Sequence, residues 1–174
     1  MKYLMCFLSF VLFAAPIELE KRELFDKKVE ILIPKEFKIM SAEMLNFKYP
    51  NRVNRPKLVF TNEDGTVNVA LNMLANSATQ ANVTAYKDAI KNSYRKAFPT
   101  AAWQGDGVVN INDRKVGYLK LITQAVDQKV YNYLFLTDVD GKIMVGTFNC
   151  TEKLMPEWEP IAQKIVSSLI VKAK

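Results

Sequence analysis

Residues 108–150 read VVNINDRKVGYLKLITQAVDQKVYNYLFLTDVDGKIMVGTFNC, and this stretch decides the fold. It contains four runs rich in β-branched, aromatic and aliphatic residues, at residues 108–112, 115–124, 129–138 and 142–150. Asx residues or the pair Asp140-Gly141 separate the runs, and both favour tight turns. The pattern predicts four consecutive antiparallel β-strands, which we expect to form the centre of the sheet.

Length and composition indicate one globular domain. The 174 residues suffice for one sizeable core, and a hydrophobic content of 49% excludes a mainly disordered chain. The net charge of +6 favours acidic partners, which include phosphates, an anionic membrane surface and an acidic protein. Because the Lys and Arg residues are scattered among 18 carboxylates, we expect no nucleic-acid binding.

The sequence contains no histidine, which removes the commonest general base and the commonest zinc ligand. The acidic turns at residues 63–65 and 138–141 lack the spacing of a calcium loop and are better explained as hairpin tips. No serine lies in a nucleophile-elbow pattern. We therefore expect no catalytic residue, no metal site and no cofactor. An enzyme that uses carboxylates brought together by the fold is the alternative.

Residues 1–15, MKYLMCFLSFVLFAA, resemble a secretory signal peptide, with a basic start, an apolar run and two alanines at the expected cleavage site. The run is too short for a stable membrane-spanning helix. We expect export to the periplasm or the extracellular space, with membrane contact only through this segment before cleavage. A retained segment, packed on a cytoplasmic domain, is the alternative. After cleavage one thiol remains, Cys150, which we expect to be a small buried apolar group.

The remaining sequence predicts a charged lead-in at residues 16–28 and a single domain at residues 29–172. A short strand ends at Pro34, and a hairpin follows at residues 58–74. In the second strand of this hairpin Val67, Val69, Leu71 and Met73 form an apolar face, and Asn68, Ala70, Asn72 and Leu74 form a mixed face. A C-terminal helix is expected to carry Pro160 in its first turn.

An amphipathic helix is predicted at residues 85–98. Its expected buried face comprises Tyr86, Ala89, Ile90, Ser93, Ala97 and Phe98. On the opposite side three cations spaced four apart form what we call the basic ridge, Lys87, Lys91 and Arg95. A second cationic element, the basic loop at residues 48–57, carries Lys48, Arg52, Arg55 and Lys57. Both elements are candidate contacts for an anion or an acidic partner, and solvated surface is the alternative.

Several of these features together resemble the PsbP-like superfamily. They are the sequence VEILIP at residues 29–34 followed by Phe37, the predicted helix, the long hairpin at residues 131–148 and the closing residues 158–169. The resemblance implies an α+β fold, namely an α/β/α sandwich with one twisted antiparallel sheet and helices on both faces. It also implies a binding role, since relatives such as PsbP, Mog and DcrB mostly act by binding. These relatives share no functional motif that identifies binding residues in this chain.

We therefore expect an exported, non-enzymatic accessory protein of a bacterial cell envelope that binds a protein partner. The alternative is a carrier of a small apolar ligand in a pocket between the sheet and a helix. The candidate lining residues of such a pocket are the aromatics Trp103, Tyr118, Tyr131, Tyr133 and Phe135. Aromatic residues at strand spacing nevertheless more often belong to the core.

Overall fold

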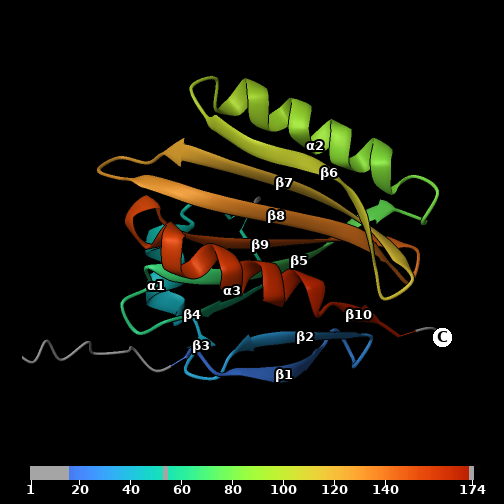
Figure 1. Cartoon of the computed structure of the whole chain (residues 1–174), viewed down its shortest axis with the longest axis horizontal. Helices are drawn as coiled ribbons and strands as arrows, with labels where there is room; N and C mark the ends of the chain where they lie inside the picture. The colour runs from blue at the N-terminus through green and yellow to red at the C-terminus, as the bar shows by residue number, and fades with distance from the viewer. Residues whose placement is uncertain (1–15, 53–54, 173–174) are drawn as a thin grey trace, which may run out of the picture.

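The computed structural model describes residues 16–52 and 55–172 (Figure 1), so the expected signal peptide lies outside the described residues. The helices are α1 (Ala42–Lys48), α2 (Val83–Ala97), α3 (Met155–Ser167) and a 3-10 turn, η1 (Glu152–Leu154). The strands are β1 (Leu19–Leu24), β2 (Val29–Pro34), β3 (Lys38–Ile39), β4 (Leu58–Thr61), β5 (Val67–Ser77), β6 (Ala102–Ile111), β7 (Arg114–Gln124), β8 (Lys129–Val139), β9 (Lys142–Thr151) and β10 (Ile170–Val171).

The fold is α+β, as the sequence predicts, but the strands of the described residues form two antiparallel sheets. A seven-stranded sheet has the order β3-β4-β5-β9-β8-β7-β6, and a three-stranded sheet has the order β1-β2-β10. The expected charged lead-in contains β1, which pairs with β2 along its whole length. Its alternating charges suit an edge strand, because charged side chains discourage pairing with other chains.

The four predicted strands at residues 108–150 are confirmed as β6 to β9, but only one of them is central, because together they form one side of the sheet. Because β5 pairs with β9, the centre is β9 and β6 is an edge strand. The turns have the expected chemistry: Asn112 and Asp113 have φ of 47° and 63°, and Asp140 has a φ of 50° before Gly141. The strand β6 also begins earlier than expected, at Ala102, through a bulge after Trp103.

One face of the large sheet is covered by α3 and the small sheet. Figure 1 shows α3 crossing in front of the large sheet, with β1 and β2 beyond it. Trp158 of α3 lies 5.6 Å from the ring of Phe37 and 6.1 Å from that of Phe148, measured between ring centroids. Pro160 lies inside the helix rather than in its first turn, because α3 begins at Met155 and places Pro156 there instead. The expected buried residues Ile165 and Leu169 belong to this core.

The other face carries α1 and α2. The predicted helix is confirmed as α2, but only part of its expected buried face is right: Tyr86 and Ile90 pack toward the sheet, whereas Ala89, Ser93 and Ala97 are exposed. The rest of the face toward the sheet comprises Val83, Lys87, Lys91 and Tyr94. Lysines can face the sheet because their aliphatic stems pack on it: a Cβ added to Gly117 would lie 2.9 Å from the Cβ of Lys87.

Candidate functional site

The sheet face between α1 and α2 is covered by no helix, and its floor is set by strand register. Three rows cross the strands β5, β9 and β8 side by side. They are Asn68, Asn149 and Asn132, then Ala70, Thr147 and Leu134, then Asn72, Val145 and Leu136. The alternation of side chains along each strand puts all three rows on the same face. The floor is therefore a mosaic of amide and aliphatic groups.

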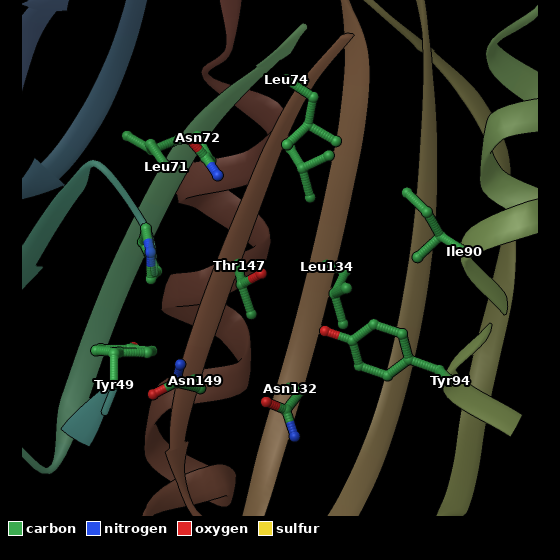
Figure 2. Close-up of a pocket in the computed structure, with 13 residues that line it drawn as sticks. Tyr49, Leu71, Asn72, Leu74, Ile90, Tyr94, Asn132, Leu134, Thr147 and Asn149 are labelled. Atoms are coloured by element: carbon green, nitrogen blue, oxygen red, sulfur yellow. The ribbon is translucent and has the colours of Figure 1, made fainter. Parts of the chain in front are cut away.

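Except for Asn68 and Leu136, which are buried, the residues of these rows form the floor of an open groove with a volume of about 340 Å³, which we call the α1–α2 groove. Tyr49 and Pro56, which follow α1 in the chain, line one side, and Ile90 and Tyr94 of α2 line the other. Figure 2 shows the hydroxyl of Tyr94 directed over the floor toward Leu134 and Asn132. Both long walls thus present an aromatic ring to the amides.

Part of the hydrogen-bonding capacity of the floor is already used within the protein. The amide nitrogen of Asn68 donates to Oδ1 of Asn149 at 2.9 Å, and that of Asn132 donates to Oγ1 of Thr123 at 3.0 Å. In contrast, Oδ1 of Asn72 is buried and accepts no hydrogen bond from the described residues. A buried acceptor without a partner is unfavourable, so this amide contributes little to stability, and a ligand can reach the atom only if the side chain turns toward the groove.

The lining of the α1–α2 groove contains no charged side chain, no serine and no cysteine among the described residues. Burial raises the pKa of Tyr94, and burial also raises the pKa of Tyr49. Both phenols therefore remain protonated at neutral pH. The site can bind a ligand by hydrogen bonding and apolar contact, but its own side chains offer no general base or nucleophile.

The basic loop follows α1 and forms the outer side of this groove. Two of its cations hold the loop together: Lys48 donates to the backbone oxygen of Gly65, and Arg55 donates to the backbone oxygen of Tyr49 at 2.8 Å and to Asn46 at 2.7 Å. Arg52 and Lys57 are exposed. The structure therefore divides the four predicted contacts into two structural cations and two that are accessible.

The basic ridge does not form the solvated surface that the sequence pattern predicts. Lys87 is only 8% exposed, and its Nζ lies 3.0 Å from Oδ2 of Asp106 on β6. Lys91 lies 2.5 Å from Oδ1 of the same carboxylate. Arg95 is exposed and lies over the ring of Trp103, 5.6 Å from its centroid. Asp106, on another element, therefore engages two of the three candidate contacts, and Arg95 is the exposed member of the ridge.

The five aromatic residues predicted to line an apolar pocket do not share one. Tyr131 and Phe135 are fully buried in the core beneath α3, and Tyr133 is 4% exposed. Trp103 lies on the opposite face of the sheet, beside Leu119 and Leu121. Only Tyr118 and Tyr133 border a hollow, a more polar one of about 270 Å³ next to α3. Alternation along the strands separates the set.

The residues that do line the groove were not singled out by sequence reasoning. Asn132 and Asn149 occur inside apolar strands, at positions where strand propensity disfavours asparagine. Asn72 was recognised only as part of a mixed face. Asparagine at matching positions of neighbouring strands was the available signal, but it becomes visible only once the pairing of β5 with β9 is known.

Comparison with known proteins defines the class to which this fold belongs. No protein-family model and no curated protein matches the chain. The solution structure of the cyanobacterial PsbP, CyanoP, from Synechocystis sp. PCC 6803 is similar, with a TM-score of 0.65 and 12% identity over 95% of this chain and 99% of that chain.

Two further solved structures share the architecture. The Saccharomyces cerevisiae Ran-binding protein Mog1p has a TM-score of 0.54 and 12% identity, over 90% of this chain and 96% of that chain. LpqN, which is involved in cell envelope biogenesis of Mycobacterium tuberculosis, has a TM-score of 0.56 and 9% identity over 83% of each chain. At these identities the likenesses establish the PsbP-like fold, which confirms the resemblance inferred from sequence.

The part of the chain that the structure describes contains neither a membrane-spanning helix nor a cluster of metal ligands. No helix among residues 16–52 and 55–172 is long and apolar enough to cross a membrane. Over the same ranges, no group of three or more Cys, Asp or Glu side chains is arranged to hold a metal ion. Cys150 is buried, as expected for a small apolar group, and burial raises the pKa of its thiol to about 12, which disfavours the thiolate at neutral pH.

Proposed function

We propose that this protein is an exported, non-enzymatic accessory protein of the cell envelope that binds a protein partner in the α1–α2 groove. The observation that carries the proposal is the amide-bearing floor between two tyrosine walls. Export is supported by the signal-like residues 1–15, and a binding role is in keeping with Mog1p and LpqN, which share the fold.

An extended segment of polypeptide suits this groove for two reasons. Its main chain offers N–H donors and C=O acceptors in regular alternation, which match the donor and acceptor groups of asparagine. Its side chains would meet Leu134, Val145 and Ile90, which give apolar contact between the amides. Recognition of main chain by polar groups and of side chains by apolar hollows is a common mode of peptide binding.

A carrier of a small apolar ligand is less well supported. The aromatic residues expected to enclose such a ligand are divided between the two faces of the sheet and mostly fill the core. The α1–α2 groove is open, and a purely apolar ligand there would cover the amides of Asn132 and Asn149 without offering them hydrogen bonds.

Site-specific photo-crosslinking in the native envelope tests the proposal. A photoreactive phenylalanine analogue replaces Thr147 on the groove floor or, as a matched control, Tyr118 beside the hollow near α3. We expect protein adducts from position 147 and none from position 118. Adducts from position 118 alone, or equal yields at both positions, would place the partner elsewhere on the molecule.

Blocking the groove provides an independent test. Thr147→Trp fills the centre of the floor without removing a hydrogen bond that the described residues make, and it should abolish crosslinking from a second probe at Ile90. The control Tyr118→Trp leaves the groove open and should preserve that crosslinking. Circular dichroism of both variants verifies that the fold is retained.

A further inference from the structure

The side of the α1–α2 groove that follows α1 carries positive charge without compensating carboxylates. From residue 44 to residue 62 the chain has four basic residues, Lys48, Arg52, Arg55 and Lys57, and no acidic one. Tyr49 and Pro56, which line the groove, lie within this same stretch. The positive charge and the groove wall are therefore built from one segment.

The cations of this stretch differ from many others in the molecule. Elsewhere Lys28 pairs with Asp140 at 2.6 Å, Arg114 with Asp138 at 2.7 Å and Lys172 with Glu30 at 2.6 Å. In contrast, none of the four basic-loop residues forms an ion pair with a carboxylate of the described residues. Their charge is left to act on whatever approaches the groove.

Only two of these cations are available for a ligand. The side chains of Lys48 and Arg55 are engaged with backbone oxygens, and these bonds hold the loop against α1 and the hairpin of β4 and β5. Arg52 and Lys57 are exposed and flank the groove residue Pro56 along the chain. Accessible guanidinium and ammonium groups bind carboxylates through charge-assisted hydrogen bonds.

We infer that the groove accepts an acidic, extended polypeptide segment of the partner, with its carboxylates at Arg52 and Lys57 and its main chain over the asparagine rows. This inference rests on the proposed function and specifies the chemistry of the partner. The ring of Phe47 on α1 is 85% exposed and offers a further apolar contact on the side of the groove formed by α1 and the basic loop.

An anionic membrane would also be attracted by these charges, but the shape and polarity of the site favour a polypeptide. A lipid surface contacts protruding elements, whereas the floor of the groove is recessed between α1 and α2 (Figure 2). Asn72, Asn132 and Asn149 line the groove, and peptide N–H and C=O groups can form hydrogen bonds with such amides, whereas acyl chains cannot. The mosaic of amide and aliphatic groups is therefore complementary to peptide rather than to hydrocarbon.

Selection from a library of random short peptides displayed on phage tests the inference with the mature chain. We expect the selected sequences to be enriched in Asp and Glu with interspersed apolar residues, and the dissociation constant of a selected peptide to rise about tenfold when its Glu residues become Gln. High salt should weaken binding of the acidic peptide in the same way, because the two cations are exposed.

Charge reversal locates the contact. Arg52→Glu/Lys57→Glu should weaken the acidic peptide about tenfold or more, whereas Lys115→Glu/Lys153→Glu, which changes the net charge equally at exposed positions elsewhere, should leave the dissociation constant unchanged. The selected peptides could instead be neutral or basic and still lose binding in the Thr147→Trp variant. That result would contradict an acidic partner but would support binding in the groove.

Two other outcomes have distinct meanings. Peptides whose binding is unaffected by Thr147→Trp would contradict the proposed function as well as the inference. In another outcome, the selection enriches no peptide, but the protein binds phosphatidylglycerol vesicles and Arg52→Glu/Lys57→Glu abolishes that binding. This result would contradict a polypeptide partner and would show that the two cations bind a membrane surface.

Discussion

The two faces of the seven-stranded sheet differ in how completely they are packed. The face beneath α3 buries Tyr131, Phe135 and Phe148 without residual exposure, and α3 and the small sheet close it. The face beneath α1 and α2 has smaller apolar clusters and an open groove floored by asparagines. One sheet thus has a closely packed face beneath α3 and a face with an open groove beneath α1 and α2.

The difference shows how one fold can separate stability from recognition. Apolar burial on the α3 face supplies the folding free energy, since each large side chain buried there contributes about 2 kcal/mol. The groove face can then carry polar groups that contribute little to stability. Substitutions on the two faces should accordingly have unequal effects on folding and on binding.

The largest effect is expected for Gly146→Ala on the packed face. A Cβ at Gly146 would lie 2.1 Å from the ring of Phe135, which is fully buried and cannot move away. We expect a loss of about 3 kcal/mol in the free energy of unfolding, measured by urea denaturation. Thr147→Ala, the next residue on the opposite face, should change it by less than about 1 kcal/mol.

A double variant checks the mechanism of this effect. Gly146→Ala combined with Phe135→Leu should be less destabilised than the sum of the two single variants, because the smaller side chain leaves room for the new methyl group. Additive effects would show that the contact with Phe135 is not the cause.

The next effect concerns the charge cluster at the edge of the groove face. Asp106→Asn removes the carboxylate that Lys87 and Lys91 share, and we expect a loss of about 2 kcal/mol at neutral pH. Hydrogen bonding to Lys91 lowers the pKa of Asp106 below 3.8, so this stability is present above pH 3.8 and lost as the pH falls through the lowered folded value.

Denaturation at several pH values measures this difference. The difference in the free energy of unfolding between the wild type and Asp106→Asn should decrease in acid. In contrast, Asp127→Asn at an exposed turn should have little effect on this free energy at any pH. A difference in the free energy of unfolding that stays constant down to the lowest pH measured would contradict the ion-pair explanation.

The tyrosines of the packed face should respond to alkali. Burial raises the pKa of Tyr133 from 10.0 to about 12, so the neutral phenol is favoured by folding. The corresponding stability is complete below pH 10 and is lost as the pH rises toward 12. We expect phenolate absorption from this residue to appear only with unfolding, and Tyr133→Phe to reduce the dependence of stability on alkaline pH. Phenolate formation in the folded protein near pH 10 would contradict this burial.

The smallest effect on stability is expected in the groove. Asn72→Leu removes a buried acceptor without a partner among the described residues, so the free energy of unfolding should stay constant or rise by up to about 1 kcal/mol. Binding of a selected acidic peptide should nevertheless weaken, as isothermal titration calorimetry would measure. A clear decrease in the free energy of unfolding would show that Asn72 on the groove face contributes to the stability of the fold.

The sequence predicted the fold better than the site for a physical reason. Strand alternation and turn residues such as Asn112 and Asp140 are local signals, and they correctly defined β6 to β9. The buried face of α2 was misjudged because Lys87 and Lys91 appear polar until their stems and the carboxylate of Asp106 are placed together. Helix periodicity alone carries no information about partners on other strands.

The groove depends entirely on such non-local pairing. Asn132 and Asn149 become neighbours only through the register of β8 with β9, and Asn68 joins them only because β5 inserts beside β9. The cations of the basic loop were visible in the sequence, but their division into structural and accessible members required the hydrogen bonds of Lys48 and Arg55.

The small sheet has a consequence for the order of folding. Its strand β2 lies between β1, the first strand of the described residues, and β10, the last. Val171 pairs with Val29, and the N–H of Lys172 donates to the oxygen of Lys28 at 2.9 Å. This pairing closes a loop that contains nearly all of the domain, and closing so long a loop costs chain entropy before its contacts are gained. The small sheet should therefore be among the last parts of the domain to form, and it joins the two ends of the domain when it does.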